Sequence, residues 1–162
     1  MGEKNAMMSR RTLVAAGLAT LALPAPAWAE ALPRLQVWRD EHCGCCVAWV
    51  DHMREAGFPI EDNVVRSVAA ARRLLGTPAD LLSCHAALVG GYALEGHVPA
   101  AAVIRLLAQR PAGIRGLAVP GMPVGSPGME VPGQAPDSYD VVAFDARGGR
   151  TVFMRFRGGT PV

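Results

Sequence analysis

The sequence lacks any concentration of charge of one sign. Its 162 residues include 16 Lys and Arg against 14 Asp and Glu, and residues 1–29 hold three of the basic residues and one of the acidic ones. The remaining chain is therefore close to neutral at pH 7. Because a nucleic-acid partner requires a basic face and a cationic partner favours an acidic tail, we expect no nucleic acid among the partners of this protein.

The sequence also lacks the motifs of several common enzyme classes. It contains no phosphate-binding loop, no pair of acidic residues at a catalytic spacing and no serine-triad signature. The scattered Asp and Glu residues are predicted to lie on the solvated surface. Long apolar runs are missing as well: residues 13–23 fall short of the roughly 20 residues that a membrane-spanning helix needs. We therefore expect no membrane span in the mature protein.

The first 29 residues are typical of a signal peptide. Arg10 and Arg11 precede the short apolar run, and Ala27-Trp28-Ala29 has the small-x-small pattern of a cleavage site. We expect residues 1–29 to be removed on export to the periplasm of a Gram-negative-type envelope. Residues 9–14 resemble a twin-arginine signal, with an ordinary Sec signal as the alternative.

Residues 30–162 combine strand and helix patterns in numbers that suit one domain with a core. Periodicity and Gly/Pro punctuation predict strands over 35–38, 63–66, 84–89 and 92–97, and helices over 47–56, 68–75 and 100–108. A Gly- and Pro-rich segment without secondary structure is predicted over 111–136, before a hairpin of strands 139–144 and 151–156. We therefore expect an α/β domain over residues 30–110, with a C-terminal extension over 111–162 packed on the same domain.

Three of the four cysteines lie within four positions, in Cys43-Gly44-Cys45-Cys46, where a strand gives way to a helix. The first turn of a helix stabilises a thiolate through its free N–H groups and the helix dipole. Cys43 and Cys46 have the spacing of a redox disulfide, which leaves Cys45 unused. Neighbouring Cys45 and Cys46 would form only a strained disulfide. The surplus thiol therefore favours a metal site.

The fourth cysteine is predicted to meet a histidine across a hairpin. If Gly90-Gly91 is a two-residue turn, Cys84 lies opposite His97, with Cβ atoms about 5 Å apart. A thiolate and an imidazole at that separation can hold one ion between them. Since neighbours on a strand alternate between faces, His85 is expected on the opposite face and is not a first-choice ligand.

Two methionines of the Gly/Pro-rich segment extend this list of soft donors. Met122 and Met129 each follow a Pro-Gly pair and belong to no helical stripe. Thioether, thiolate and imidazole together suit Cu(I), whereas zinc rarely takes a thioether. The alternative is that both methionines are hydrophobic contacts that fix the segment to the domain.

These residues resemble those of the CopG-like family of periplasmic copper-resistance proteins. The matching stretches are CGCC at 43–46, SCHAALVGGYALEGHVPA at 83–100 and GLAVPGMPVGSPGME at 116–130. The resemblance implies a thioredoxin-like domain with a C-terminal extension. It also implies a site for one or more copper ions, as Cu(I) or Cu(II), with Cys43, Cys45, Cys46 and Cys84 as ligands. His97, Met122 and Met129 match motif positions, and their role as ligands is our inference.

Two departures from ordinary thioredoxins weaken a role in dithiol exchange. His42 stands where a thioredoxin has tryptophan, and no proline precedes Cys84 where a thioredoxin has its cis-proline. Three hypotheses remain. The first is a monomeric copper-binding protein in copper resistance, served by periplasmic copper carriers or exporters. The second is a thiol–disulfide oxidoreductase that uses Cys43 and Cys46. The third is a domain stabilised by two structural disulfides.

Overall fold

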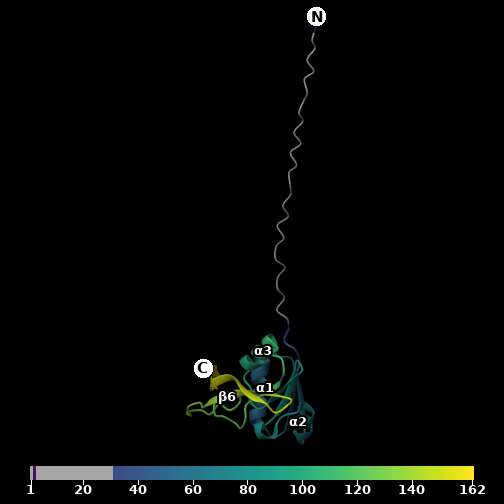
Figure 1. Cartoon of the computed structure of the whole chain (residues 1–162). Coiled ribbons are helices and arrows are strands. Elements are labelled where there is room, and N and C mark those ends of the chain that lie inside the picture. The colour runs from purple at the N-terminus through teal and green to yellow at the C-terminus, as the bar shows by residue number, and fades with distance from the viewer. Residues whose placement is uncertain (1, 3–30) are drawn as a thin grey trace. The chain divides into compact units, whose positions relative to one another are not determined.

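An eight-stranded mixed sheet has the strand order β2-β1-β3-β4-β5-β6-β7-β8. Figure 1 shows the course of the chain, with the three helices and β6 labelled. The computed structural model describes residue 2 and residues 31–162, so the predicted signal peptide lies outside the described residues. The strands are β1 (Leu35–Arg39), β2 (Ile60–Val64), β3 (Ala86–Val89), β4 (Tyr92–Glu95), β5 (Ile114–Ala118), β6 (Ser138–Asp145), β7 (Arg150–Arg157) and β8 (Thr160–Pro161). The predicted α/β class is therefore confirmed.

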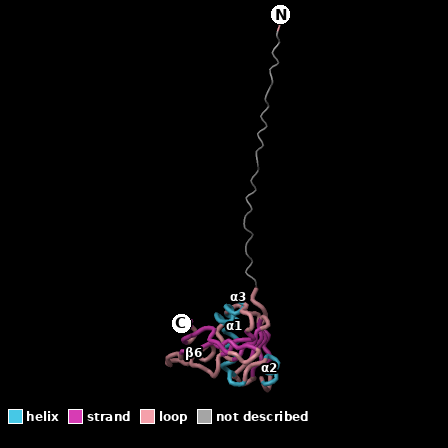
Figure 2. Tube along the Cα trace, viewed as in Figure 1, coloured by secondary structure: helices cyan, strands magenta, loops and turns pink. Residues whose placement is uncertain are grey.

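Three α-helices pack on the two faces of this sheet (Figure 2): α1 (Gly44–Glu55), α2 (Ala69–Leu75) and α3 (Ala100–Gln109). Trp49 of α1 and Leu106 of α3 belong to one buried apolar cluster, together with Leu35 of β1. Leu75 of α2 belongs to a second cluster with Phe144 of β6. Each fully buried side chain of this size contributes about 1.5–3 kcal/mol, so both clusters hold the helices to the sheet.

Helix α1 forms because its apolar residues recur at helical spacing. Cys46, Trp49, Val50 and Met53 lie on one face and are all buried. The helix starts directly after Cys43, which occupies the N-cap position. The chain then leaves the helix at Gly57, whose φ of 93° is costly for residues with a side chain. The motif that carries the three cysteines is thereby fixed at the start of a buried helix, as predicted.

The C-terminal extension continues the same sheet. Strand β5 pairs in parallel with β4, and β6 pairs antiparallel with β5. The sequence predicted neither β5, which lies within the Gly- and Pro-rich segment, nor the short strand β8. Strand β2 also begins three residues earlier than the predicted strand 63–66. The remaining irregular segment, residues 119–137, is called the Gly/Pro loop below. Among the described residues, no helix combines the length and the apolar character that crossing a membrane requires.

The β3–β4 hairpin has the predicted register. Val89 pairs with Tyr92 across the Gly90-Gly91 turn, and the ladder continues to the pair of Ala86 and Glu95. Gly96 then adopts a φ of 70°, and the N–H of Val98 donates to the carbonyl oxygen of Gly96. The regular alternation of side chains therefore ends just before His97.

Candidate metal centre

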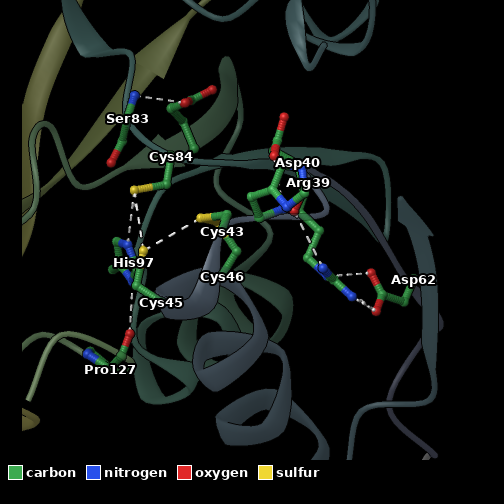
Figure 3. The surroundings of a disulfide bond; sticks show 12 residues. Arg39, Asp40, Cys43, Cys45, Cys46, Asp62, Ser83, Cys84, His97 and Pro127 are labelled. Carbon is green, nitrogen blue, oxygen red and sulfur yellow. Dashed lines mark hydrogen bonds and ion pairs between the residues drawn. A yellow bond between two sulfur atoms is a disulfide. The ribbon is translucent and has the colours of Figure 1, made fainter. Parts of the chain in front are cut away.

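Four sulfur atoms meet where the start of α1 approaches the segment before β3 (Figure 3). All four Sγ atoms lie within 4.8 Å of one another. Cys43 and Cys46 form a disulfide, whereas Cys45 and Cys84 carry free thiols. The Sγ of Cys45 lies 3.5 Å from that of Cys43 and 3.7 Å from that of Cys84. The predicted convergence of the downstream cysteine with the triplet is therefore present in the structure.

The two free thiols lie in an environment that keeps Cys84 protonated. Burial and the neighbouring Cys45 thiol raise the pKa of Cys84 to about 12. The positive charge of Arg72 acts in the opposite direction but is outweighed. Because a metal binds the thiolate rather than the thiol, a metal ion must displace this proton. Metal binding at Cys84 is thus expected to release a proton and to strengthen as the pH rises.

His97 presents an unprotonated nitrogen to the sulfurs. Its Nδ1 lies 2.8 Å from the carbonyl oxygen of Pro127, and its Nε2 lies 3.4 Å from the Sγ of Cys84. A carbonyl oxygen can only accept, so Nδ1 carries the proton and the lone pair of Nε2 points toward Cys84. Burial also lowers the pKa of His97, which keeps the ring neutral. Imidazole ligands of metal ions have this arrangement.

The Gly/Pro loop crosses from one side of the cysteine cluster to the other. The Oγ of Ser83 donates a hydrogen bond to the carbonyl oxygen of Gly121. Further along, Gly128 lies against the first turns of α1, where an added Cβ would lie 2.6 Å from the carbonyl oxygen of Cys45. Met122 is 55% exposed and Met129 is half-buried. The structure thus brings the loop to the cysteine cluster and leaves the Met122 side chain exposed at the protein surface.

The segment with Cys84 and His97 matches a known protein family. A family model described as a protein of unknown function, DUF411, matches residues 81–129. Two solved structures, described as Form 1 and Form 2 of the copper resistance protein CopG, are each 40% identical to this chain. Alignment with them covers 78% and 77% of this chain and 99% and 98% of theirs, with TM-scores of 0.72 and 0.71. The chain belongs to the CopG-like copper-resistance family.

A search of curated proteins found no match. Membership of the CopG-like family agrees with the resemblance predicted from the cysteine motifs. Together with the four-cysteine cluster, it supports a copper-related role for this chain.

The expectation for the orientation of His85 was wrong. His85 does not face away from His97: their ring centroids are 5.1 Å apart, and His85 also packs on Trp49 at 4.3 Å. His85 and His97 both lie outside the regular ladder, which ends at the pair of Ala86 and Glu95, and Gly96 has a φ of 70°, so the strict alternation of faces does not extend to them. Neither ring nitrogen of the buried His85 has a hydrogen-bond partner among the described residues. Burial accordingly lowers the pKa of His85 well below its usual value.

Glu95 was also assigned wrongly, because it is buried and not solvated. Its side chain is 0% exposed and forms an ion pair with Arg72 of α2, with an Nη2–Oε1 distance of 2.6 Å. The N–H of Ser83 donates to the same carboxylate at 2.8 Å, and Arg72 donates to the carbonyl oxygen of Ser83. Its position opposite Ala86 in an otherwise apolar hairpin was the sequence signal for this burial. This network fixes the backbone that precedes Cys84.

His42, by contrast, is solvated as expected. Its side chain is 86% exposed beside Glu41, and its backbone N–H donates to the Asp40 carboxylate. His42 therefore lies near the cysteines in sequence without pointing into the cluster.

Proposed function

We propose that this protein binds copper, as Cu(I), through the thiolates of its four cysteines and the Nε2 of His97, and that it acts in copper resistance. One observation carries this proposal: four sulfur atoms from two distant segments lie within 4.8 Å of one another. Such a compact set of soft donors suits Cu(I). The description of the solved relatives as copper resistance proteins supports the choice of copper over zinc.

The donor set depends on the redox state of the Cys43–Cys46 disulfide. In the disulfide form the site offers the thiols of Cys45 and Cys84 and the imidazole of His97. Two electrons and two protons convert the disulfide into two further thiols, which become ligands when they lose their protons. Four thiolates serve more than one copper ion only if sulfur atoms bridge, so we propose a multinuclear, redox-active site in the reduced protein. The thioethers of Met122 and Met129 complete the proposed ligand set.

The finer features of fold and location also belong to this proposal. The order β2-β1-β3-β4, with α1 and α3 on one face and α2 on the other, supports a thioredoxin-like core over residues 30–110. The signal features of residues 1–29 support export to the periplasm. There the mature monomer would exchange copper with carriers or exporters.

Anaerobic reconstitution tests the proposal. The fully reduced mature chain is titrated with Cu(I) against a chromophoric Cu(I) chelator, and bound copper and free thiols are counted. We expect at least one tightly held ion, with binding weakened at least tenfold in Cys84→Ser and in His97→Asn. His42→Asn is the matched control, because this exposed histidine lies outside the cluster, and it should bind as the parent does. Copper retention that is equal in all four proteins would overturn the proposal.

A thiol–disulfide oxidoreductase is the second candidate function, and the Cys43–Cys46 disulfide favours it. The free thiol of Cys45 lies within 3.5 Å of the disulfide sulfur of Cys43, and thiolate attack on a disulfide sulfur is the step of exchange. This function predicts that the metal-free protein oxidises a model dithiol in its disulfide form, or reduces a model disulfide in its dithiol form, at a rate that Cys43→Ser abolishes. A metal-free protein that is inert in this assay would exclude it.

A further inference from the structure

We propose that Ser83 is a positioning residue that holds the Gly/Pro loop closed over the cysteine cluster and so sets the rates at which copper enters and leaves. The expected effect on copper exchange rests on the proposed copper site, whereas the contact between Ser83 and the loop does not. Ser83 directly precedes Cys84, and its Oγ donates to the carbonyl oxygen of Gly121 in the loop.

The hydroxyl of Ser83 is a fixed donor because its backbone is held on both sides. Its N–H donates to the buried Glu95 carboxylate at 2.8 Å, and its carbonyl oxygen accepts from Arg72. Gly96 leaves room for this arrangement, since a Cβ there would lie 2.5 Å from the Ser83 Oγ. The loop therefore closes against an anchor that α2 and β4 keep in place.

The loop is internally braced, so we expect it to move as a unit. The N–H of Gly125 donates to the carbonyl oxygen of Met129 at 2.8 Å. The N–H of Met129 in turn donates to the carbonyl oxygen of Ser126 at 2.7 Å. The hydroxyl of Ser126 donates to the carbonyl oxygen of Pro123. Opening one end of such a segment leaves its internal hydrogen bonds intact.

The two ends of the segment are attached very differently. Gly128 packs on the backbone of α1, where a Cβ would lie 2.6 Å from the Cys45 carbonyl oxygen and 2.8 Å from the Trp49 nitrogen. At Gly121 an added Cβ would meet nothing within 4 Å, and the adjacent Met122 is 55% exposed.

Val119 is buried and its N–H donates to the carbonyl oxygen of Glu95 at 3.0 Å, so the stretch that opens is the exposed one after it, around Gly121. The Ser83 hydroxyl is the side-chain hydrogen bond that holds this stretch to the body of the domain.

Where the cysteines and His97, which lie outside the loop, hold the ion alone, loss of this hydrogen bond should change rates and not affinity; a thioether ligand from Met122 or Met129 would make the affinity fall as well. A single net hydrogen bond shifts a closed–open equilibrium by about fivefold, so the open population should rise by that factor in Ser83→Ala. Because an open loop admits and releases copper alike, both rates rise together and their ratio stays the same. Replacement of a residue that coordinates copper, in contrast, would change the dissociation constant for copper.

Peptide-resolved alkylation of Cys45 in the metal-free protein tests the geometry alone. Cys45 is the thiol to follow, because the loss of the Ser83 hydroxyl also alters the surroundings of its neighbour Cys84. We expect Cys45 to be alkylated about fivefold faster in Ser83→Ala than in the parent under native conditions. In urea, where both chains are unfolded, the two proteins should be alkylated at the same rate. Ser126→Ala is the matched control: it removes a hydroxyl bond inside the loop, but the backbone N–H of residue 126 still donates to the same Pro123 carbonyl oxygen, so the rate should stay near that of the parent.

Stopped-flow transfer of Cu(I) to a chelator tests the consequence with the same variants. Ser83→Ala should release and take up copper about fivefold faster with an unchanged dissociation constant. Unchanged alkylation in Ser83→Ala, or an equal effect of Ser126→Ala, would overturn the inference even if copper binds. Faster alkylation in a protein that holds no copper would instead leave the loop assignment standing and refute the copper function.

Gly121→Ala provides a second approach should Ser83→Ala fold poorly. Gly121 has a φ of 71° and open space around it, so an alanine strains this end of the loop without touching the cluster. It should likewise accelerate both Cys45 alkylation and copper transfer. A parent-like rate in well-folded Gly121→Ala would contradict a loop that opens at this end.

Discussion

The surroundings of the cysteine cluster, here called the cysteine corner (residues 43–46, 83–85 and 95–97), differ from the β6–β7 hairpin in where their polar groups lie. In the cysteine corner, the buried groups include an imidazole that has no hydrogen-bond partner among the described residues and a carboxylate with 0% exposure, and two partly buried free thiols lie beside them. In the β6–β7 hairpin, the apolar side chains of Phe144 and Phe156 are buried, and the Arg155–Asp140 ion pair lies at the surface. A protein retains buried polar groups at a cost, so this contrast indicates which region is built for chemistry and which for stability.

The sharpest test of this contrast compares one ion pair from each region. Arg72→Gln leaves the Glu95 carboxylate buried and uncompensated, so it should lower the free energy of unfolding by about 3–5 kcal/mol. Arg155→Gln breaks an exposed pair and should cost less than about 1 kcal/mol. Urea unfolding of the metal-free proteins measures both. Equal losses in the two variants would remove the distinction between the regions.

A pair of glycines in the Gly/Pro loop gives the next largest effect. Gly128 and Gly133 both have positive φ, at 85° and 78°, but a Cβ on Gly128 meets the backbone of α1 whereas one on Gly133 meets nothing within 4 Å. Gly133→Ala should cost about 1–2 kcal/mol of backbone strain. Gly128→Ala should cost about 1–3 kcal/mol more because of the clash, and it should also weaken copper retention. Thermal unfolding and copper counting check this, and equal behaviour of the two variants would show that Gly128 is not held against the helix.

The unpartnered imidazole predicts a stabilising substitution. His85→Leu removes, at similar volume, two buried nitrogens that have no hydrogen-bond partner within the described part of the chain, so it should raise the free energy of unfolding by about 1–2 kcal/mol. Copper stoichiometry should stay the same, because His97 and the cysteines are the proposed ligands. A lower stoichiometry in His85→Leu would assign His85 to the copper site.

The smallest expected effect is a pH dependence of stability. Burial lowers the pKa of His85, His97 and His52, so these rings stay neutral in the folded protein while the unfolded chain protonates them below about pH 6.5. The unfolded state then binds more protons, and the free energy of unfolding should fall by the order of 1 kcal/mol between pH 7.5 and 5.5. Urea unfolding of the metal-free protein measures this change, and His85→Leu should reduce it. A stability that rises over this interval would contradict the buried histidines.

The sequence predicted those parts of the site that depend on local rules. Helical spacing placed the cysteine triplet at the start of α1, and the Gly90-Gly91 turn fixed the hairpin register that leads to Cys84 and His97. The contact of Cys84 with His97 was correct although its geometric reason was incomplete. Strand pairing ends at Glu95, and the positive φ of Gly96 then turns His97 toward Cys84.

What the sequence missed depends on tertiary contacts. Glu95 is charged and therefore looked solvated, but Arg72, which is 23 positions away, compensates its charge in the interior. Strand β5 lies in a segment whose glycines disfavour a strand in isolation. Gly116 is needed there because a Cβ would lie 2.2 Å from the carbonyl oxygen of Ala93 on the paired strand β4. Neither the ion pair nor the close approach leaves a periodic signal in the chain.

The parallel pairing of β4 with β5 makes the C-terminal extension inseparable from the half of the domain that carries the cysteine cluster. Leu94 pairs with Leu117 in the middle of the sheet, so a chain cut after residue 110 would expose a hydrophobic strand edge next to Glu95. Unprotected edges of this kind recruit other strands. A shortened version intended as a minimal copper binder would therefore self-associate, and any engineering of this scaffold has to retain the extension or cap that edge.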